Sequence, residues 1–240
     1  MCAIPLQAGS DSPLCRWCEP PHALTPSGER CLRCGEPGDQ VCFACERSPI
    51  VSGRVISAGL YEGAYEPAIK TYKYQGRRRI AAVLGQRLVD RLRAEVDVSS
   101  TAGWDLVVPV PSSLRSLTTR GFHHTLLIAK LLGNAFRVPV SRWALRYRSS
   151  PSPQASLLPA ARWENVHSML TAKARIVRGK QLLLVDDVLT TGATLNAADR
   201  ALLGAGALRV DAITVARSTQ LTNYRLQRLA DESRSKVRWD

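Results

Sequence analysis

Short, unbroken runs of apolar residues alternate along this chain with longer segments in which apolar side chains recur every third or fourth position. Unbroken runs are typical of strands that are buried on both faces of a parallel sheet. The expected strands are 54–61, 105–111, 182–185 and 210–216. The expected helices are 62–74, 78–95, 120–132 and a segment after Thr194 that stops at 204–206. This alternation predicts an α/β fold with a Rossmann-like parallel sheet.

The chemistry is expected where the strand 182–185 ends. Asp186 and Asp187 follow it, and a loop of hydroxyls and one glycine then leads into a helix: Thr190, Thr191, Gly192, Ala193 and Thr194. Open parallel sheets bind ligands at the carboxyl ends of their strands. The loop offers backbone N–H groups and a helix N-terminus to an anion. The acids cannot face that anion, so they are expected to bind hydroxyls or a metal-bound group beside it.

A phosphorylated sugar satisfies both halves of this site. In the plainer alternative, the two acids only favour the N-terminus of the next helix.

A second strand-loop-helix unit also predicts an anion site. The strand 105–111 ends in prolines, a polar loop 112–119 follows, and Arg120-Gly121-Phe122 opens a helix. Arg115 and Arg120 lie near the start of that helix, and the fork of an arginine binds phosphate oxygens in pairs.

Residues 146–165 are rich in Ser, Pro, Arg and Ala and are expected to form a mobile loop. Such a loop can close over a bound ligand and exclude water. Its candidate ligand contacts are Arg148, Gln154 and Arg162. The alternative is an exposed basic linker.

Six of the seven cysteines form CxxC pairs, which are Cys15/Cys18, Cys31/Cys34 and Cys42/Cys45. Two such pairs supply four thiolates to one tetrahedral ion, which indicates a structural zinc site. Cys31, Cys34, Cys42 and Cys45 are the preferred set, because the spacer is short and Cys34-Gly35 is typical of a zinc knuckle. Cys15/Cys18 with Cys31/Cys34 stays open as an alternative. A redox role is disfavoured, since no βαβ pattern surrounds any pair.

The chain is strongly basic, with a formal net charge of +13, which favours polyanionic partners such as nucleic acid or phosphorylated small molecules. Lys70, Lys73 and Arg77 are interleaved with Tyr72 and Tyr74. Cations neutralise phosphates and aromatic rings stack on bases, so this cluster is a candidate nucleic-acid surface. A solvated helix end with Tyr72 in the core is the alternative.

No stretch reaches the roughly 18 apolar residues of a membrane helix, and no signal peptide is evident, so we expect a cytoplasmic protein. The expected domains are a cysteine-rich zinc module (1–50), the α/β domain (51–217) and a basic tail (218–240) in which a frayed helix covers 221–229.

The stretch 182–194 resembles the signature of the type I phosphoribosyltransferases, which is four apolar residues, two acids and a Thr-Gly-x-Thr loop. Several further motifs occur in the order found in the ComF/GntX family: the CxxC pairs, Leu60-Tyr61-Glu62-Gly63, Lys73-Tyr74-x-Gly76-Arg77, Val108-Pro109-Val110-Pro111, Arg120-Gly121-Phe122, Gln154-x-x-Leu157 and Arg162-x-x-Asn165-Val166. The chain is therefore similar to that family over residues 15–217.

The resemblance implies a type I phosphoribosyltransferase fold with a lid loop, behind a small zinc-ribbon-like module. It implies that Asp186 and Asp187 bind the ribose of phosphoribosyl pyrophosphate, that 190–194 binds its 5′-phosphate and that the loop with Arg115 and Arg120 binds pyrophosphate. Mg²⁺ would accompany the ligand. Members of the family act in the uptake of single-stranded DNA in natural transformation, so DNA and the DNA-uptake machinery are expected partners.

Three functional alternatives stay open: a ligand-binding protein linked to DNA handling, an active phosphoribosyltransferase with an unknown acceptor, and a non-catalytic DNA-binding protein or scaffold. In an active enzyme, Asp186 and Asp187 are the candidate catalytic residues. His123-His124 stands where the family has Asn-Gln. Adjacent histidines point about 100° apart on a helix, so a role on the helix surface is favoured over a catalytic one.

Overall fold

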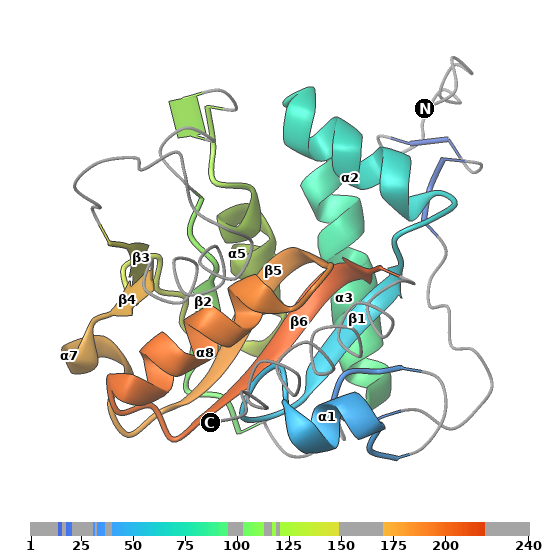
Figure 1. Ribbon diagram of the computed structural model, residues 1–240. Helices are drawn as coiled ribbons and strands as arrows, with labels where there is room; N and C mark the ends of the chain where they lie inside the picture. The colour runs from blue at the N-terminus through green and yellow to red at the C-terminus, as the bar shows by residue number, and fades with distance from the viewer. Residues whose placement is uncertain are drawn as a thin grey trace, which may run out of the picture.

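The core of the protein is a parallel sheet of four strands in the order β1-β6-β5-β2 (Figure 1). Their bounds are Val55–Leu60 for β1, Arg209–Arg217 for β6, Gln181–Leu189 for β5 and Leu106–Pro109 for β2. The computed structural model describes residues 14–15, 18–20, 31, 33–36, 40–95, 103–112, 117–118, 121–148 and 170–218. The prediction of a parallel α/β sheet is confirmed.

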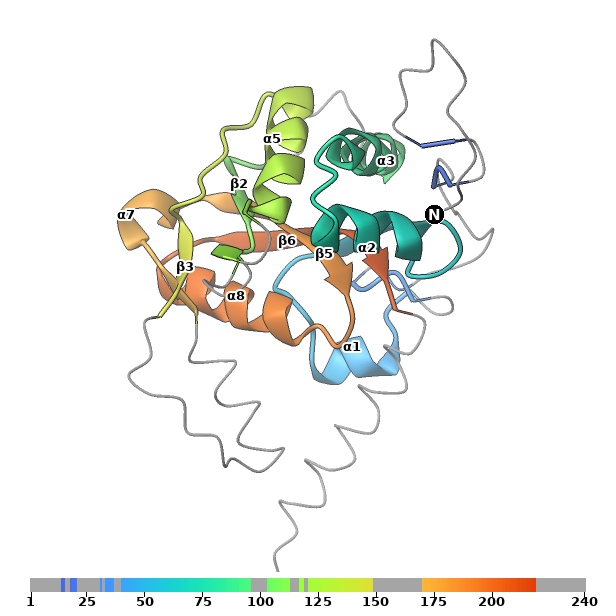
Figure 2. The same cartoon turned by 90° about the horizontal axis from the view of Figure 1, so that it is seen from above.

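Helices cover both faces of this sheet (Figure 2). One face carries α2 (Tyr65–Tyr74), α3 (Ile80–Glu95) and α5 (His124–Phe136), and the other carries α1 (Phe43–Arg47) and α8 (Ala193–Gly204). Alternate residues of β5 point to opposite faces. Leu183 and Val185 belong to the buried cluster under α2, α3 and α5, whereas Leu182 and Leu184 belong to the cluster under α8.

A second, smaller sheet pairs β3 (Leu145–Tyr147) with β4 (Leu170–Ala172) in antiparallel register, and α7 (Ala174–Val177) follows it. It lies beside the β2 edge of the main sheet and contacts α8 (Figure 1). The segment expected as a mobile loop, 146–165, therefore begins inside β3. Its residues from 149 onward lie outside the described part of the chain.

Two element boundaries differ from the expectation, and each has a local cause. The strand β5 does not end before the acids but continues through them to Leu189. The helix expected from Arg120 begins at His124, because Gly121 has a left-handed backbone (φ +71) and His123 is an extended N-cap. None of the described helices has the length and apolar character needed to span a bilayer.

The N-terminal cysteines pack onto the main sheet. Cys31, Cys34 and Cys45 are buried in the same cluster as Leu182 and Leu184 of β5. The β6 residue Arg217 also bonds to the module, through the carbonyl oxygen of Cys34 at 3.3 Å and the carboxylate of Glu36. The module shares its core with the α/β domain, and the boundary expected at residue 50 stays a prediction.

Candidate functional site

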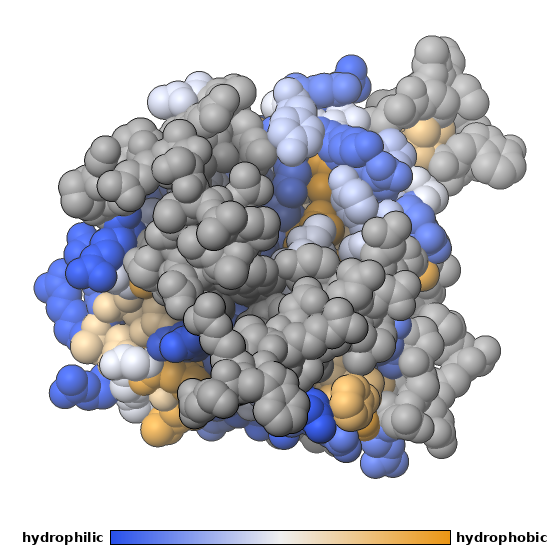
Figure 3. Space-filling view, viewed as in Figure 1, coloured by the Kyte–Doolittle hydropathy of each residue, from blue (hydrophilic) through white to orange (hydrophobic). Residues whose placement is uncertain are grey.

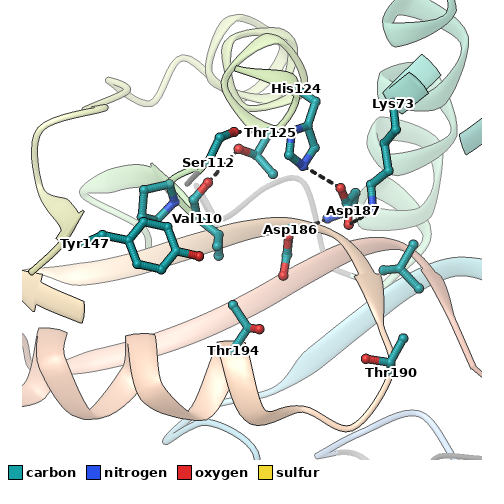
Figure 4. Close-up of a pocket in the computed structure, with 12 residues that line it drawn as sticks. Lys73, Val110, Ser112, His124, Thr125, Tyr147, Asp186, Asp187, Thr190 and Thr194 are labelled. Carbon is teal, nitrogen blue, oxygen red and sulfur yellow. Dashed lines mark hydrogen bonds and ion pairs between the residues drawn. The ribbon is translucent and has the colours of Figure 1, made fainter. Parts of the chain in front are cut away.

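A pocket of about 270 Å³ opens at the carboxyl ends of β2 and β5. It lies at the edge of the sheet, so side chains from both faces reach it (Figure 4). Its walls come from seven elements or loops and include Lys73, Ser112, His124, Tyr147, Asp186 and Asp187. Hydrophilic residues make up much of the coloured surface on the face shown in the space-filling view (Figure 3).

The neighbouring acids Asp186 and Asp187 point to opposite faces of the sheet, because both lie within β5. Asp186 points toward α8 and Thr194, and Asp187 points toward α2 and α5 (Figure 4). Both are buried, with 9% and 5% of their surface exposed. The two acids are therefore not equivalent, although they are adjacent in the sequence.

Asp187 contacts two basic side chains from the helices above it. The Lys73 Nζ atom lies 2.8 Å from its Oδ1, and the His124 Nε2 atom lies 2.6 Å from its Oδ2. His124 is itself held in place, since its Nδ1 is 3.3 Å from the Ser112 hydroxyl and its carbonyl oxygen accepts a 2.6 Å hydrogen bond from Tyr72.

These surroundings move the pKa values of the two acids in opposite directions. Burial, followed by the negative charge of Asp187, raises the pKa of Asp186 to about 8. Burial also acts to raise the pKa of Asp187, but His124 and Lys73 outweigh it and bring that pKa to about 2. Near neutral pH, Asp187 is thus the fixed anion, and Asp186 binds or releases a proton.

The loop that precedes α8 has the geometry expected of an anion site. Gly192 is the N-cap of α8 in a left-handed conformation (φ +79), and the helix has neither a side-chain cap nor an acid in its first turn. Its first N–H groups therefore face no negatively charged side chain of their own helix. Within the loop, the amide of Ala193 donates a hydrogen bond to the Thr191 hydroxyl at 3.3 Å.

The back of this loop rests on the segment that leaves the cysteine module. A Cβ atom at Gly192 would lie 3.2 Å from the Ile50 side chain. The Asn196 amide donates to the carbonyl oxygens of Pro49 (3.3 Å) and Ile50 (3.2 Å). The cysteine module thereby supports the loop from the side opposite the pocket.

The structure brings together some of the expected site residues and separates others. Asp186, Asp187, Thr190 and Thr194 line one pocket. Arg148 follows β3 and is exposed. Arg115, Arg120, Gln154 and Arg162 lie outside the described residues.

The three cations grouped as a nucleic-acid surface also separate. Lys70 is exposed and pairs with Glu66 at 2.6 Å, and Arg77 is exposed. Lys73 instead turns into the pocket and pairs with Asp187. Lys70 and Arg77 remain as surface candidates.

Sequence reasoning missed two pocket residues and misjudged a third. Ser112 and Tyr147 were not singled out for the site. The expectation that both histidines lie on the helix surface is wrong for His124, which is 7% exposed and contacts Asp187. The departure from the family's Asn-Gln was the available signal. Only His124 lies within the helix, since His123 is its extended N-cap, so the argument from a 100° separation does not apply.

The preferred cysteine set lies together. Sγ atoms of Cys31, Cys34, Cys42 and Cys45 are all within 4.8 Å of one another, and none of these four residues is in a disulfide. The Cys45 thiol, and then burial, raise the pKa of Cys34 far above its usual range. A cation among the four sulfurs would favour their ionised form, so the donor set fits a structural metal ion such as zinc.

The remaining CxxC pair lies on the other side of the sheet. Cys18 packs against the cluster under α2, α3 and α5, and the nearby Glu19 pairs with Arg87 of α3 at 2.6 Å. The alternative that joined Cys15/Cys18 with Cys31/Cys34 is therefore not favoured by the fold.

Comparison with known proteins agrees with this geometry. Residues 128–235 match the family described as phosphoribosyl transferase domain. The chain is 26% identical over 221 residues to DNA utilization protein YhgH of Escherichia coli K12, which covers 88% of this chain and 92% of that protein. It is 27% identical over 207 residues to competence protein ComFC of Bacillus subtilis 168, which covers 80% and 79%.

Among solved structures, the chain is similar to a glutamine phosphoribosylpyrophosphate amidotransferase from B. subtilis, with 22% identity and a TM-score of 0.42 over 60% of this chain and 30% of that one. It is also similar to a purine phosphoribosyltransferase from Pyrococcus horikoshii, with 15% identity and a TM-score of 0.34 over 57% and 82%. Both likenesses are too distant to support a functional conclusion.

The matches to YhgH and ComFC extend over most of the chain, and the transferase-domain match includes the acids and the threonine loop. The chain is therefore similar to the ComF proteins over most of its length, and its phosphoribosyltransferase-type α/β domain lies behind a four-cysteine module.

Proposed function

We propose that the pocket binds phosphoribosyl pyrophosphate, or a related phosphorylated ribose, together with Mg²⁺. The observation that carries this proposal is that Asp186 points toward the first turn of α8 from within the same pocket (Figure 4). A carboxylate accepts hydrogen bonds from ribose hydroxyls, and the N-terminus of α8 attracts a phosphate. The two chemistries lie side by side, as a sugar phosphate requires.

Charge in the pocket is compatible with such a ligand. Lys73 adds a largely buried positive charge beside the acids. Mg²⁺ prefers oxygen ligands and is commonly bound through substrate phosphates plus one or two carboxylates. Asp186 is the candidate carboxylate, and the ion would neutralise charge on a departing pyrophosphate.

The other end of the ligand is assigned to residues outside the described part of the chain. We propose that Arg115 and Arg120 bind the pyrophosphate and that Arg148, Gln154 and Arg162 belong to a segment that closes over the pocket. Arg148 directly follows Tyr147, which lines the pocket, so this segment starts at the pocket rim.

The context of this binding is proposed to be the handling of single-stranded DNA during natural transformation. The names of the relatives, a competence protein and a DNA utilization protein, support it. Tyr74 is 68% exposed at the end of α2, near the exposed cations Lys70 and Arg77, and offers a ring on which a base can stack. An active phosphoribosyltransferase in nucleotide metabolism and a non-catalytic scaffold are the alternatives.

Ligand binding is tested by melting curves with and without phosphoribosyl pyrophosphate and Mg²⁺. Wild-type protein should melt several degrees higher with ligand, because a ligand that binds only the folded state stabilises it. Asp186→Asn should lose this increase. Asp105→Asn, at the opposite end of the sheet, is the matched control and should keep it. An unchanged wild-type melting temperature would refute the assignment.

Catalysis is tested in the same samples by release of pyrophosphate. Release that depends on an added acceptor would favour the enzyme alternative, and ligand binding without release would favour a binding protein.

DNA binding is tested with a single-stranded oligonucleotide over a range of salt concentrations. The double variant Lys70→Ala/Arg77→Ala should bind more weakly, with a salt slope that falls by roughly 1 to 2 units. Arg175→Ala/Arg200→Ala removes the same charge from exposed positions elsewhere and should bind like wild type. If both double variants lose DNA affinity equally, DNA binding reflects only non-specific attraction by the protein's net charge. Lys73 is unsuitable for this test, because its change would also alter the pocket.

A further inference from the structure

Three side chains that could bind a metal ion converge at the upper end of the pocket. His124 comes from the first turn of α5, and Asp186 and Asp187 come from β5. Each of these side chains offers one ligand atom, and the three atoms all lie within 4.8 Å of one another. Figure 4 shows the imidazole of His124 directed at the acids.

Each of these three residues is anchored through one polar atom, and the second polar atoms of His124 and Asp187 face each other. His124 Nδ1 lies 3.3 Å from the Ser112 hydroxyl, and Asp187 Oδ1 lies 2.8 Å from Lys73 Nζ. Asp186 Oδ1 accepts the backbone N–H of Asp187 at 2.9 Å. Metal-binding histidines and carboxylates are commonly oriented in this way by partners outside the coordination sphere.

Two of these atoms contact each other. Asp187 Oδ2 is buried, and its contact in this structure is His124 Nε2 at 2.6 Å. A buried carboxylate oxygen without a partner is costly. An ion bound by both atoms would take the place of this contact and keep both atoms partnered.

Charge decides whether such a cation is stable there. A metal-bound imidazole is neutral, so two ionised carboxylates, the Lys73 ammonium and a divalent ion together carry a charge of +1. The pocket would then attract an anionic ligand more strongly than Lys73 alone can. The mixture of one imidazole and two carboxylates suits Mn²⁺, Fe²⁺, Co²⁺ or Zn²⁺, whereas Mg²⁺ prefers oxygen ligands only.

We propose that His124, Asp186 and Asp187 form a binding site for a divalent transition-metal ion, with Mn²⁺ as the representative ion, coordinated directly by the protein. This site is separate from the four-cysteine cluster. It deepens the proposed function, because the ion would lie where the ribose hydroxyls of the sugar phosphate are assigned. Ion binding itself needs no sugar phosphate and is measured without one.

The test titrates Mn²⁺ into zinc-loaded, full-length protein and follows the electron paramagnetic resonance signal of free Mn²⁺. Zinc occupies the four-cysteine site and keeps Mn²⁺ out of it. The thiolates of that site also disfavour Mn²⁺, because they are soft ligands. Wild-type protein should bind one Mn²⁺ per chain. His124→Asn should weaken this binding at least roughly tenfold, and Ser112→Ala should weaken it by a smaller factor.

His123→Asn is the matched control. His123 is the half-buried neighbour that precedes α5, and its loss should leave Mn²⁺ affinity unchanged. Circular dichroism checks that each variant is folded, and Asp186→Asn supplies a second ligand deletion if His124→Asn does not fold. The proposal is overturned if wild type binds no Mn²⁺, or if His124→Asn and Asp186→Asn both bind it as wild type does.

A second measurement separates this inference from the proposed function. Melting curves with ribose 5-phosphate in metal-free buffer report the sugar-phosphate site alone. Mn²⁺ binding with no effect of ribose 5-phosphate or phosphoribosyl pyrophosphate would retain the metal site and refute the proposed function. Sugar-phosphate binding with no Mn²⁺ binding would retain the proposed function and refute the metal site.

Discussion

His124 Nε2 lies 2.6 Å from Asp187 Oδ2, so the first turn of α5 contacts an acid in the carboxyl half of β5. Lys73 reaches the same acid from α2. One carboxylate therefore connects two helices to the central strand. Its role is structural as well as chemical, and changes to its partners should affect both folding and ligand binding.

Replacing Lys73 by methionine should destabilise the protein by roughly 2 kcal/mol, because Asp187 stays buried with one of its two partners lost. Lys70→Met is the matched control, since Lys70 lies one turn earlier on α2 and pairs with Glu66 at a similar distance but with 57% of its side chain exposed. Solvent screens an exposed pair, so its loss should change stability much less. Urea unfolding measures both, and equal losses would contradict this interpretation of the pair.

Ribose 5-phosphate should bind more tightly as the pH rises from 7 to 9. Asp186 has a pKa of about 8 and must lose its proton to accept bonds from two hydroxyls, so the ionised fraction rises about tenfold over this range. The phosphate group is already ionised at pH 7. Calorimetric titration without divalent ions measures the affinity.

Asp186→Asn provides the control, and its weaker affinity should not change with pH. The raised pKa of Asp186 also makes the free energy of unfolding depend on pH. The stabilising contribution of the protonated Asp186 is present in full below the unfolded pKa of about 3.8 and is lost as the pH rises through about 8. A wild-type affinity that stays constant between pH 7 and 9 would show that Asp186 does not contact the ligand as an ionised acceptor.

The sheet could be predicted because its strands are rich in apolar residues and the central strand β5 contains an unbroken apolar run. Leu182 to Val185 is buried on both faces, and such runs identify central parallel strands without knowledge of their neighbours. The direction of the two acids could not be obtained in this way. It depends on whether β5 continues past Val185, which is decided by pairing with β6 at Asp186 and Val188.

The partners of Asp187 also could not be predicted from sequence patterns. Lys73 and Asp187 are far apart along the chain, and the basic character of α2 favoured a surface role for all of its cations. Only the packing of α2 and α5 against the same face of the sheet brings Lys73 and His124 to one carboxylate.

Gly192→Ala should weaken ligand binding and reduce stability by about 1 to 2 kcal/mol. The left-handed backbone at φ +79 disfavours any Cβ, and this one would also lie 3.2 Å from Ile50. Gly63→Ala is the control: Gly63 has φ +55 but nothing within 4 Å of its Cβ position. It should lose about 1 kcal/mol and keep full affinity for ribose 5-phosphate.

Cys45→Ser should remove the bound metal from the four-cysteine cluster and lower the melting temperature, because metal binding supplies folding free energy. Affinity for ribose 5-phosphate should also fall, since Asn196 attaches the start of α8 to Pro49 and Ile50. Elemental analysis should find one zinc per chain in wild type and in Cys18→Ser, and none in Cys45→Ser. Zinc loss in Cys18→Ser instead would contradict the assigned ligand set.

The placement of Asp186 and Asp187 on opposite faces of β5 also bears on how such proteins diverge. Substitutions under α2 and α5 alter the surroundings of one acid, and substitutions in the threonine loop alter those of the other. Each half of the site can therefore change by separate steps. The pair His123-His124, which stands where the family has Asn-Gln, belongs to the α5 half, so this difference changes the surroundings of Asp187 and leaves the threonine loop as it is.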